Sequence, residues 1–257
     1  MADPAPNAEM RWDYTAHASH YDKRADYSGA AIQALLDATG SKPPKTVADI
    51  GAGTGKLTKE LLKRGLTVRS VEPNDAMRQI GMRNTARQAV QWSVGTGEHT
   101  GLPDHSFHAA FFGSSFNVVD QAQALMEVAR ILLPRGWFAC MWNHRDLDDP
   151  AQGRIEAIIK SFIPSYSYGL RREDPTATIA ASGYFGPVRS LSGNFAWDMP
   201  KADIIEAWKS HATLRRQAGS DTTFEQVVAA ISQSLQDLPA VISVPYTTRI
   251  FFAQLAS

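Results

Sequence analysis

Cysteine and net charge are what this sequence has least of. Its 257 residues include one cysteine, which cannot form a disulfide within the chain, so a reducing compartment is favoured. The 26 Lys and Arg residues are balanced by 26 Asp and Glu residues, and the formal net charge is zero. A neutral chain creates no long-range field that attracts nucleic acid or an anionic membrane, and we expect neither as a partner.

Long hydrophobic runs are also missing. The longest apolar stretches, such as Trp137–Trp142 and Ile250–Ala253, are far shorter than the roughly 20 residues that a membrane helix needs. The N-terminal residues include acids and prolines but no apolar core of a secretory signal. Because 44% of the residues are apolar, the composition is that of a globular protein, and we expect a cytoplasmic one.

Signatures of several kinds of catalysis are absent as well. The seven histidines show no H-x₃-H or H-E-x-x-H spacing and there is no cysteine pair, so we expect no metal site. No GxSxG elbow accompanies the serines, which disfavours a hydrolase. Cys140 lies in an apolar run and is expected to be a buried small hydrophobe.

What the sequence does contain is an alternation of strand and helix patterns between residues 46 and 142. Short apolar runs are separated by segments of about ten residues with helical spacing, an order typical of βαβ units with a parallel sheet. The predicted strands are Thr46–Ile50, Thr67–Val71, Val90–Val94, Phe107–Gly113 and Trp137–Trp142. The clearest predicted helices are Ala30–Thr39, Asp75–Met82 and Gln121–Leu133.

The regular alternation of strand and helix patterns ends after residue 145. A loop-rich stretch at 164–187 separates a first predicted helix from the remaining elements. The predicted helices are Ile155–Ile163, Ala202–Ala212 and Phe224–Leu235, and the predicted strands are Pro187–Trp197 and Tyr246–Ala253. We interpret this part as the end of the same sheet with an inserted helical cap.

A glycine cluster follows the first predicted strand, in the segment VADIGAGTGK at 47–56. Such a turn lets a ligand approach the backbone closely, with helix amides directed at it. A phosphate-binding Walker loop needs four residues between its Gly and Gly-Lys, whereas three separate Gly51 from Gly55, and Leu57 replaces the hydroxyl residue. The dinucleotide pattern GxGxxG also fails, because Lys56 stands where the third glycine belongs.

An acid stands at the end of the second predicted strand, where Glu72 lies 17 residues after Gly55. A carboxylate there can accept hydrogen bonds from both hydroxyls of a ribose, and its charge excludes a 2′-phosphate. Alone, such an acid fits a surface position at a strand end equally well. Together with the glycine cluster and Asp49, it favours a cofactor that contains a nucleoside.

Four segments lie in order between residues 46 and 142. They are VADIGAGTGKLTKELLKRG, VEPNDAM, GTGEHTGLPDHSFHAAFFGSSF and EVARILLPRGWFACMW. In this order they resemble the class I S-adenosylmethionine-dependent methyltransferases. Within that family, the sequence is most similar to the small-molecule group that includes trans-aconitate and ubiquinone-biosynthesis methyltransferases. The resemblance implies an α/β fold, with a Rossmann-like, doubly wound, mostly parallel seven-stranded sheet, an antiparallel last strand and an inserted helical cap. It also implies S-adenosyl-L-methionine as the cofactor.

The resemblance carries cofactor-binding roles onto individual residues. The glycine turn would flank the methionine part, the acid after the second strand would hold the ribose, and later loops would contact the adenine. The residues implied are Asp49, Gly51, Ala52, Gly53, Glu72, Pro73, Met77, Thr96, Gly97, Glu98 and Ser114.

The segment YDKRADYS at 21–28 resembles the Y…R-P-x-Y segment that covers the cofactor in small-molecule members, although Ala25 replaces the proline. Tyr21 would pack nearby and Arg24 would pair the cofactor carboxylate. An ordinary charged helix turn is the alternative. The expected organisation is an N-terminal helical segment covering the cofactor (1–40), a cofactor-binding core (41–145) and the end of the sheet with an acceptor-binding cap (146–257).

Two departures from the family pattern concern the acceptor. His108 replaces the aspartate that commonly begins the fourth strand, and Asn117-Val118 replaces a His-Trp pair found in related enzymes. The acceptor of the nearest relatives therefore cannot be transferred to this chain. Methyl transfer needs mainly orientation and a dry site, and a general base only when the acceptor must lose a proton.

Candidate residues for acceptor chemistry are histidines and aromatics near the expected cavity. We predict His144, which follows the fifth strand, and His20 as candidate catalytic residues. The predicted acceptor-binding residues are Tyr14, His17, Phe116, Asn117 and Trp142. The expected partner is a small-molecule methyl acceptor with an aromatic or apolar surface, bound by a monomer or homodimer. Two alternatives are a cofactor-binding regulatory protein without catalysis and a nicotinamide oxidoreductase, which Lys56 disfavours.

Overall fold

A seven-stranded sheet in the order β3-β2-β1-β4-β5-β7-β6 forms the centre of the molecule, seen here in a computed structural model that describes residues 15, 18–43 and 45–256. Strands β1 to β5 pair in parallel, and β7 runs antiparallel to both of its neighbours. The strands are β1 (Thr46–Ile50), β2 (Thr67–Val71), β3 (Val90–Ser93), β4 (Phe107–Gly113), β5 (Leu132–Arg145), β6 (Arg189–Pro200) and β7 (Val241–Gln254). The predicted fold class is confirmed.

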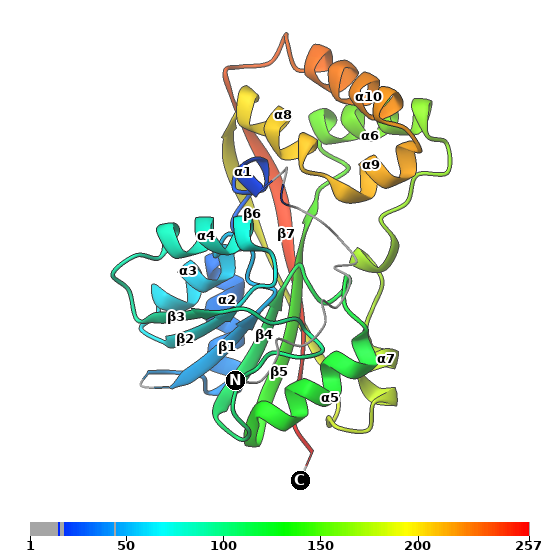
Figure 1. Cartoon of the computed structure of the whole chain (residues 1–257). Helices are drawn as coiled ribbons and strands as arrows, with labels where there is room; N and C mark the ends of the chain where they lie inside the picture. Colours follow the sequence, from blue (N-terminus) through cyan, green and yellow to red (C-terminus); the bar gives the residue numbers. More distant parts are fainter. Residues whose placement is uncertain (1–14, 16–17, 44, 257) are drawn as a thin grey trace, which may run out of the picture.

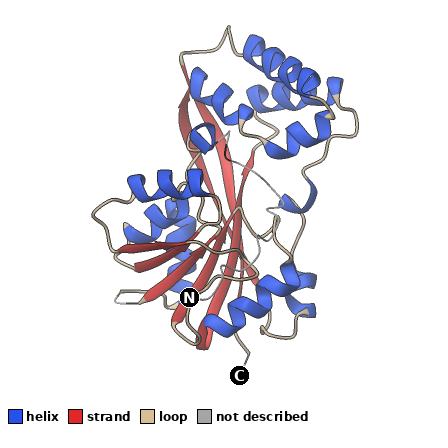
Figure 2. Ribbon diagram, viewed as in Figure 1, coloured by secondary structure: helices blue, strands red, loops and turns tan. Residues whose placement is uncertain are grey.

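Helices cover both faces of this sheet (Figures 1 and 2). Helices α2 and α3 pack one face through a cluster that includes Leu35, Leu61 and Phe111, and α5 and α7 pack the other through Leu125, Val128 and Ile179. The first set of helices is α1 (Ala18–Tyr21), α2 (Gly29–Thr39), α3 (Lys56–Leu62), α4 (Asp75–Asn84) and α5 (Gln121–Ile131). The later set is α6 (Pro150–Phe162), η2 (Gly169–Arg171), α7 (Thr176–Ala181), α8 (Lys201–Lys209), α9 (Ala212–Ala218) and α10 (Asp221–Ser234).

Side-chain caps set where several helices begin. Ser28, Asn74, Asp120 and Asp149 each accept a hydrogen bond from a backbone N–H in the first turn of α2, α4, α5 and α6. Each such cap contributes about 1 kcal/mol, because it satisfies an N–H that the helix itself cannot pair. Gly40 ends α2 in the left-handed conformation, which carries no Cβ penalty in glycine.

A separate helical cap stands above the carboxyl ends of the strands, at the top of Figure 1. It is built from α6, which follows β5, and from α8 to α10, which lie between β6 and β7. Its own apolar cluster joins Ile155 and Ile159 of α6 to Trp208 of α8 and Val227 of α10. The long strands β6 and β7 enter this cluster with Met199 and Val244, so the sheet itself connects the core to the cap.

Several element bounds differ from those predicted. Strand β5 starts at Leu132, ahead of the Pro134-Arg135-Gly136 turn, because Leu132 still pairs with Phe107 before the register shifts and Trp137 pairs with Ala109. Strand β7 starts at Val241 and not at Tyr246 as predicted. Pro245 lies within the strand, opposite Ala196 of β6, although a proline usually marks the end of a strand pattern. Two short helices, α7 and α9, were not predicted, because six or seven residues carry too little periodicity.

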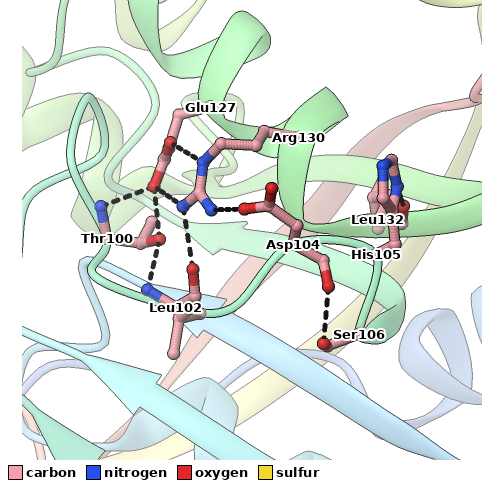
Figure 3. Close-up of polar contacts among 8 residues, drawn as sticks. All are labelled: Thr100, Leu102, Asp104, His105, Ser106, Glu127, Arg130 and Leu132. Carbon is pink, nitrogen blue, oxygen red and sulfur yellow. Dashed lines mark hydrogen bonds and ion pairs between the residues drawn. The ribbon is translucent and has the colours of Figure 1, made fainter.

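A polar network fastens the loop between β3 and β4 to helix α5 (Figure 3). Arg130 donates to Glu127 and to the carbonyl of Leu102, and also contacts Asp104. Glu127 in turn accepts hydrogen bonds from the backbone N–H and the hydroxyl of Thr100. Burial acts to raise the pKa of Glu127, but these hydrogen bonds outweigh it and lower the pKa below its usual value. The network holds the loop that follows residues 96–98 in place.

Within the described part of the chain, no helix is long and apolar enough to cross a membrane.

Candidate active site

The glycine turn between β1 and α3 brings backbone rather than side chains to the edge of the sheet. Gly51 and Gly53 have φ values of 66° and 58°, in the left-handed region that glycine adopts without strain. A Cβ on Gly51 would lie 2.5 Å from the Cβ of Ser115, in the turn after β4. The absence of a side chain on Gly51 therefore lets the turn after β4 pack directly against the glycine turn.

Two buried carboxylates lie near this turn, one close to the carboxyl end of β1 and one directly after β2. Glu72, directly after β2, accepts hydrogen bonds from the N–H groups of Gly53 at 2.8 Å and Asn74 at 2.9 Å. Asp49 in β1 accepts from the hydroxyl of Thr58 at 2.6 Å through Oδ2, while its Oδ1 has no partner among the described residues. Burial raises the pKa of Glu72 and raises the pKa of Asp49 to about 7.

The residues predicted to surround an adenine lie along the neighbouring turns. Met77 at the start of α4 approaches Gly53, since a Cβ there would lie 3.3 Å from the terminal methyl of Met77. After β3, Gly97 packs against Val119, and Glu98 accepts a hydrogen bond of 2.7 Å from the N–H of Asp120. The loop after β3 is therefore joined to the segment that follows β4. Pro73 and Thr96 lie in the same turns, beside Glu72 and Gly97.

A cavity of about 110 Å³ lies between the carboxyl ends of the strands and the cap. Its lining comes from the segment around α1, from Ser114 after β4, from the end of β5, from the loop at 168–172, from α8 and from β7. Aromatic side chains form part of the wall, among them Tyr27, Tyr168, Trp208 and Tyr246. Tyr27 places its hydroxyl 3.0 Å from the hydroxyl of Ser114, which joins the cavity to the end of β4.

Positive charge dominates the described lining of the cavity. Five of these side chains are cationic and none is a carboxylate; the cations are Arg24, Lys56, Arg145, Arg171 and Arg172. Lys56 is paired with Asp26 at 2.9 Å and Arg145 approaches Glu156 at 3.7 Å. Within the described residues, neither Arg171 nor Arg172 forms an ion pair with a carboxylate.

Two histidines line the cavity, and a hydrogen bond with the backbone determines which ring nitrogen of each carries the proton. The Nε2 of His144 lies 2.9 Å from the carbonyl oxygen of Arg171, which can only accept, so Nε2 carries the proton and Nδ1 keeps its lone pair. Burial lowers the pKa of His144 to about 4, so its ring is neutral near pH 7. The Nδ1 of His211 accepts the N–H of Leu214 at 3.2 Å and thereby caps α9. Burial, followed by nearby arginines, lowers the pKa of His211 well below its usual value.

The segment after α1 is tied to both the core and the cap. Arg24 donates to the hydroxyl and the carbonyl of Ser210 in the cap, at 2.9 and 2.7 Å, and its guanidinium lies over the ring of Tyr21. On the core side, the amide of Asn143 in β5 donates to the carbonyl of Asp26 at 2.8 Å. The segment thus forms the side of the cavity where core and cap meet.

The structure places the predicted site residues at different distances from the cavity. Tyr21, Arg24, Ser114 and His144 line the cavity. The other predicted cofactor residues lie at the strand ends beside it, and His20 contacts Glu206 of α8 without lining it. Tyr14 and His17 lie outside the described residues.

The structure places the remaining predicted acceptor residues in or against the core. Phe116 is fully buried and packs against the rings of Phe112 and Phe138. Trp142 is 1% exposed, and its ring N–H donates to Asn117 at 2.8 Å. None of the three lines the cavity, since Phe116 and Trp142 belong to the apolar cluster on the α5 side of the sheet, and their role in acceptor binding stays a prediction.

Sequence reasoning selected Arg24 but not the other three arginines of the cavity. Arg145, Arg171 and Arg172 come from the end of β5 and from the turn at 169–172, which meet only in the folded chain. The available signals were the arginine directly after His144 and the Arg-Arg pair at 171–172, which two acids follow directly. As for metals, no cluster of three His, Cys, Asp or Glu side chains occurs within the described residues.

Sheet order, glycine turn and strand-end acids together define an α/β protein of the Rossmann-like class, with its ligand edge at the carboxyl ends of the strands. Residues 48–140 match the family model described as a methyltransferase domain. Over this part of its length, the chain is similar to methyltransferases.

Individual relatives agree over part of the chain. An uncharacterized methyltransferase of Mycobacterium tuberculosis is 37% identical over 139 residues, which cover 54% of this chain and 55% of that protein. The chain thus spans about half the length of this curated relative. A ubiquinone/menaquinone biosynthesis C-methyltransferase of Caulobacter vibrioides is 28% identical over 166 residues, covering 57% of this chain and 65% of that protein.

One solved structure resembles the whole fold. Phosphoethanolamine N-methyltransferase 2 of Haemonchus contortus, in complex with S-adenosyl-L-methionine, superposes with a TM-score of 0.56 at 15% identity. The match covers 99% of this chain and 62% of that one, and it shows likeness of fold.

Proposed function

We propose that this chain transfers a methyl group from S-adenosyl-L-methionine to a small molecule held in the cavity between core and cap. The observation that carries the proposal is the position of the cavity. It adjoins the turn after β4 through Ser114, and that turn packs directly on the glycine turn after β1. A donor at the strand ends and an acceptor in the cavity would therefore be neighbours, as an in-line transfer requires.

The residues at the strand ends fit such a cofactor. Gly51 and Gly53 leave main-chain atoms open to the methionine part, and the unpartnered Oδ1 of Asp49 is an acceptor for its ammonium group. Glu72 uses its carboxylate to hold the N–H groups of Gly53 and Asn74, and further lone pairs on both oxygens remain for the two ribose hydroxyls. Met77 and the turn at 96–98 would cover the adenine.

When bound, the cofactor supplies a methyl group on a positively charged sulfur. The chain's own part is to orient the acceptor and to exclude water, which together account for several kcal/mol of the barrier. Tyr27, Trp208 and Tyr246 provide the walls that exclude water. A low-lying pKa makes His144 a weak base, so its Nδ1 is suited to orienting an acceptor by one hydrogen bond.

Binding and turnover test the proposal separately. Isothermal titration of the purified chain with S-adenosyl-L-methionine and with S-adenosylhomocysteine should give dissociation constants in the micromolar range, whereas NAD should not bind. Incubation with the labelled donor and a metabolite extract should transfer label to a small molecule. Absence of binding at millimolar cofactor would overturn the proposal. Binding without any labelled product would favour a cofactor-binding regulatory protein instead.

A further inference from the structure

On the cap side of the cavity, a hydrogen-bond donor of His211 lies next to a hydrogen-bond donor of Arg171. The N–H of Leu214 can only donate, so Nδ1 of His211 must accept, and the proton of the neutral ring resides on Nε2. This Nε2 lies 3.4 Å from Nη1 of Arg171, which is also a donor. Both side chains line the cavity, and no acceptor from the described residues satisfies the pair. An oxygen with two lone pairs, placed beside both, would satisfy it.

The charged groups around His211 and Arg171 also favour a bound anion. Nη2 of Arg172 donates to the carbonyl of Arg145 at 3.0 Å, and its guanidinium lies 4.2 Å from the ring centroid of Tyr168. These are neutral partners, and burial lowers the pKa of Arg172. Glu156 is shared by Arg145 and Tyr168, so its charge is already engaged. Arg171 and Arg172 are both half-buried and lack a carboxylate partner among the described residues, so a bound anion would supply the missing counter-charge.

We propose that the methyl acceptor carries an anionic oxygen group, a carboxylate or a phosphate, bound by Arg171, Arg172 and the Nε2–H of His211. This inference rests on the proposed function, since it names the substrate class of the same cavity. Planar guanidinium groups suit the paired oxygens of such an anion. The anion is the recognition group, and the aromatic rings of Tyr168 and Trp208 would contact the rest of the acceptor.

Substitutions at His211 separate ligand binding from a structural role. Asparagine is among the best N-cap residues, so His211→Asn keeps an acceptor for the Leu214 N–H but removes the Nε2–H from the cavity. His211→Ala removes both. We expect both variants to weaken anion binding, and only His211→Ala to lower the midpoint of thermal unfolding.

Small probes test the charge requirement without any reaction. Titration calorimetry at low ionic strength would use succinate, inorganic phosphate and the neutral succinamide on the whole chain. We expect at least one anion to bind and succinamide not to bind. Arg171→Gln and Arg172→Gln should each weaken that binding tenfold or more, while the same change at the exposed Arg83 of α4 should leave it unchanged. A preference for succinate or for phosphate would identify which oxyanion the site takes.

Three results would overturn the inference. They are binding of neither anion, equal binding of succinamide, or unchanged anion affinity in Arg171→Gln and Arg172→Gln variants that unfold at the wild-type temperature. A separate titration of the wild type with S-adenosylhomocysteine distinguishes the two proposals. If the cofactor fails to bind while the anions bind through these arginines, the methyltransferase proposal fails and the anion site stands.

Discussion

The strand ends beside the cavity, called the core wall below, and the cap side of the cavity, called the cap wall, differ in charge and in construction. On the core wall, the carboxylates of Asp49 and Glu72 end adjacent parallel strands and lie within 23 positions of each other in sequence. On the cap wall, the donors of Arg171, Arg172 and His211 come from a loop and from the start of α9. An acidic wall suits the cationic cofactor of the proposed function, and a basic wall suits an anionic acceptor. Under that proposal, rigid strand ends would hold the cofactor, and residues of the connecting segments would select the acceptor.

Removing the acid of the core wall should have the largest effect. We expect Glu72→Ala to weaken S-adenosylhomocysteine binding about 100-fold, or roughly 2.7 kcal/mol, because it removes the proposed ribose acceptor and frees the N–H groups of Gly53 and Asn74. Isothermal titration measures the affinity. Binding of succinate or phosphate should change less than threefold, since the acid lies on the other wall.

Glu225→Ala on the exposed face of α10 is the matched control for this change. An equal loss of affinity in both variants would show that the effect is not local to the core wall. A Glu72→Ala variant that binds the cofactor normally would contradict the assignment of the ribose site.

The pH dependence of cofactor binding should be the next largest effect. Because burial raises the pKa of Asp49 to about 7, a proton competes with the cofactor's ammonium group below that pH. Affinity for S-adenosylhomocysteine should therefore rise about tenfold or more from pH 5.5 to pH 8 and then level off. In the free protein, the stability associated with the neutral carboxyl is present below pH 4 and is lost as pH rises through 7.

Asp49→Asn provides the comparison for this titration, since it keeps the shape of the side chain without its charge. Its affinity should vary little over the same range of pH. A wild-type profile as flat as that of the variant would rule out Asp49 as the group that meets the ammonium.

The smallest expected effect concerns the shape of the core wall. Gly51→Ala and Gly40→Ala both place a Cβ on a residue with positive φ, 66° and 61°, which costs about 1–2 kcal/mol. Only at Gly51 does the new Cβ meet Ser115, at 2.5 Å, whereas nothing lies within 4 Å at Gly40. Chemical denaturation should therefore show Gly51→Ala to be the less stable variant, by about 1 kcal/mol. Equal stabilities would mean that the turn relaxes freely.

The core wall could be predicted from the sequence because its parts are local. Gly51, Gly53 and Asp49 are contiguous with a strand and a helix whose patterns are clear, and Glu72 ends the next strand. The cap wall could be predicted only in part: His144 follows a clear strand, whereas Arg171 lies 27 residues further along the chain and His211 another 40, with no common period. The sequence also did not show that Phe116 and Trp142 are buried in the core, because position at the end of a strand does not decide which face of the sheet a side chain takes.

The placement of β7 has a consequence for the order in which the chain can fold. Strand β5 pairs with β4 on one side and with β7 on the other, and β7 consists of residues 241–254. Until those residues leave the ribosome, the apolar edge of β5 has no partner, and Ile155 in the cap lacks Val244 as a neighbour. The part of the sheet from β1 to β4 can thus form during synthesis, whereas β6, β7 and the cap depend on contacts of high sequence separation and must form last. A nascent chain that stalls before Val241 would leave the apolar edge of β5 unpaired and prone to aggregation beside an already folded glycine turn.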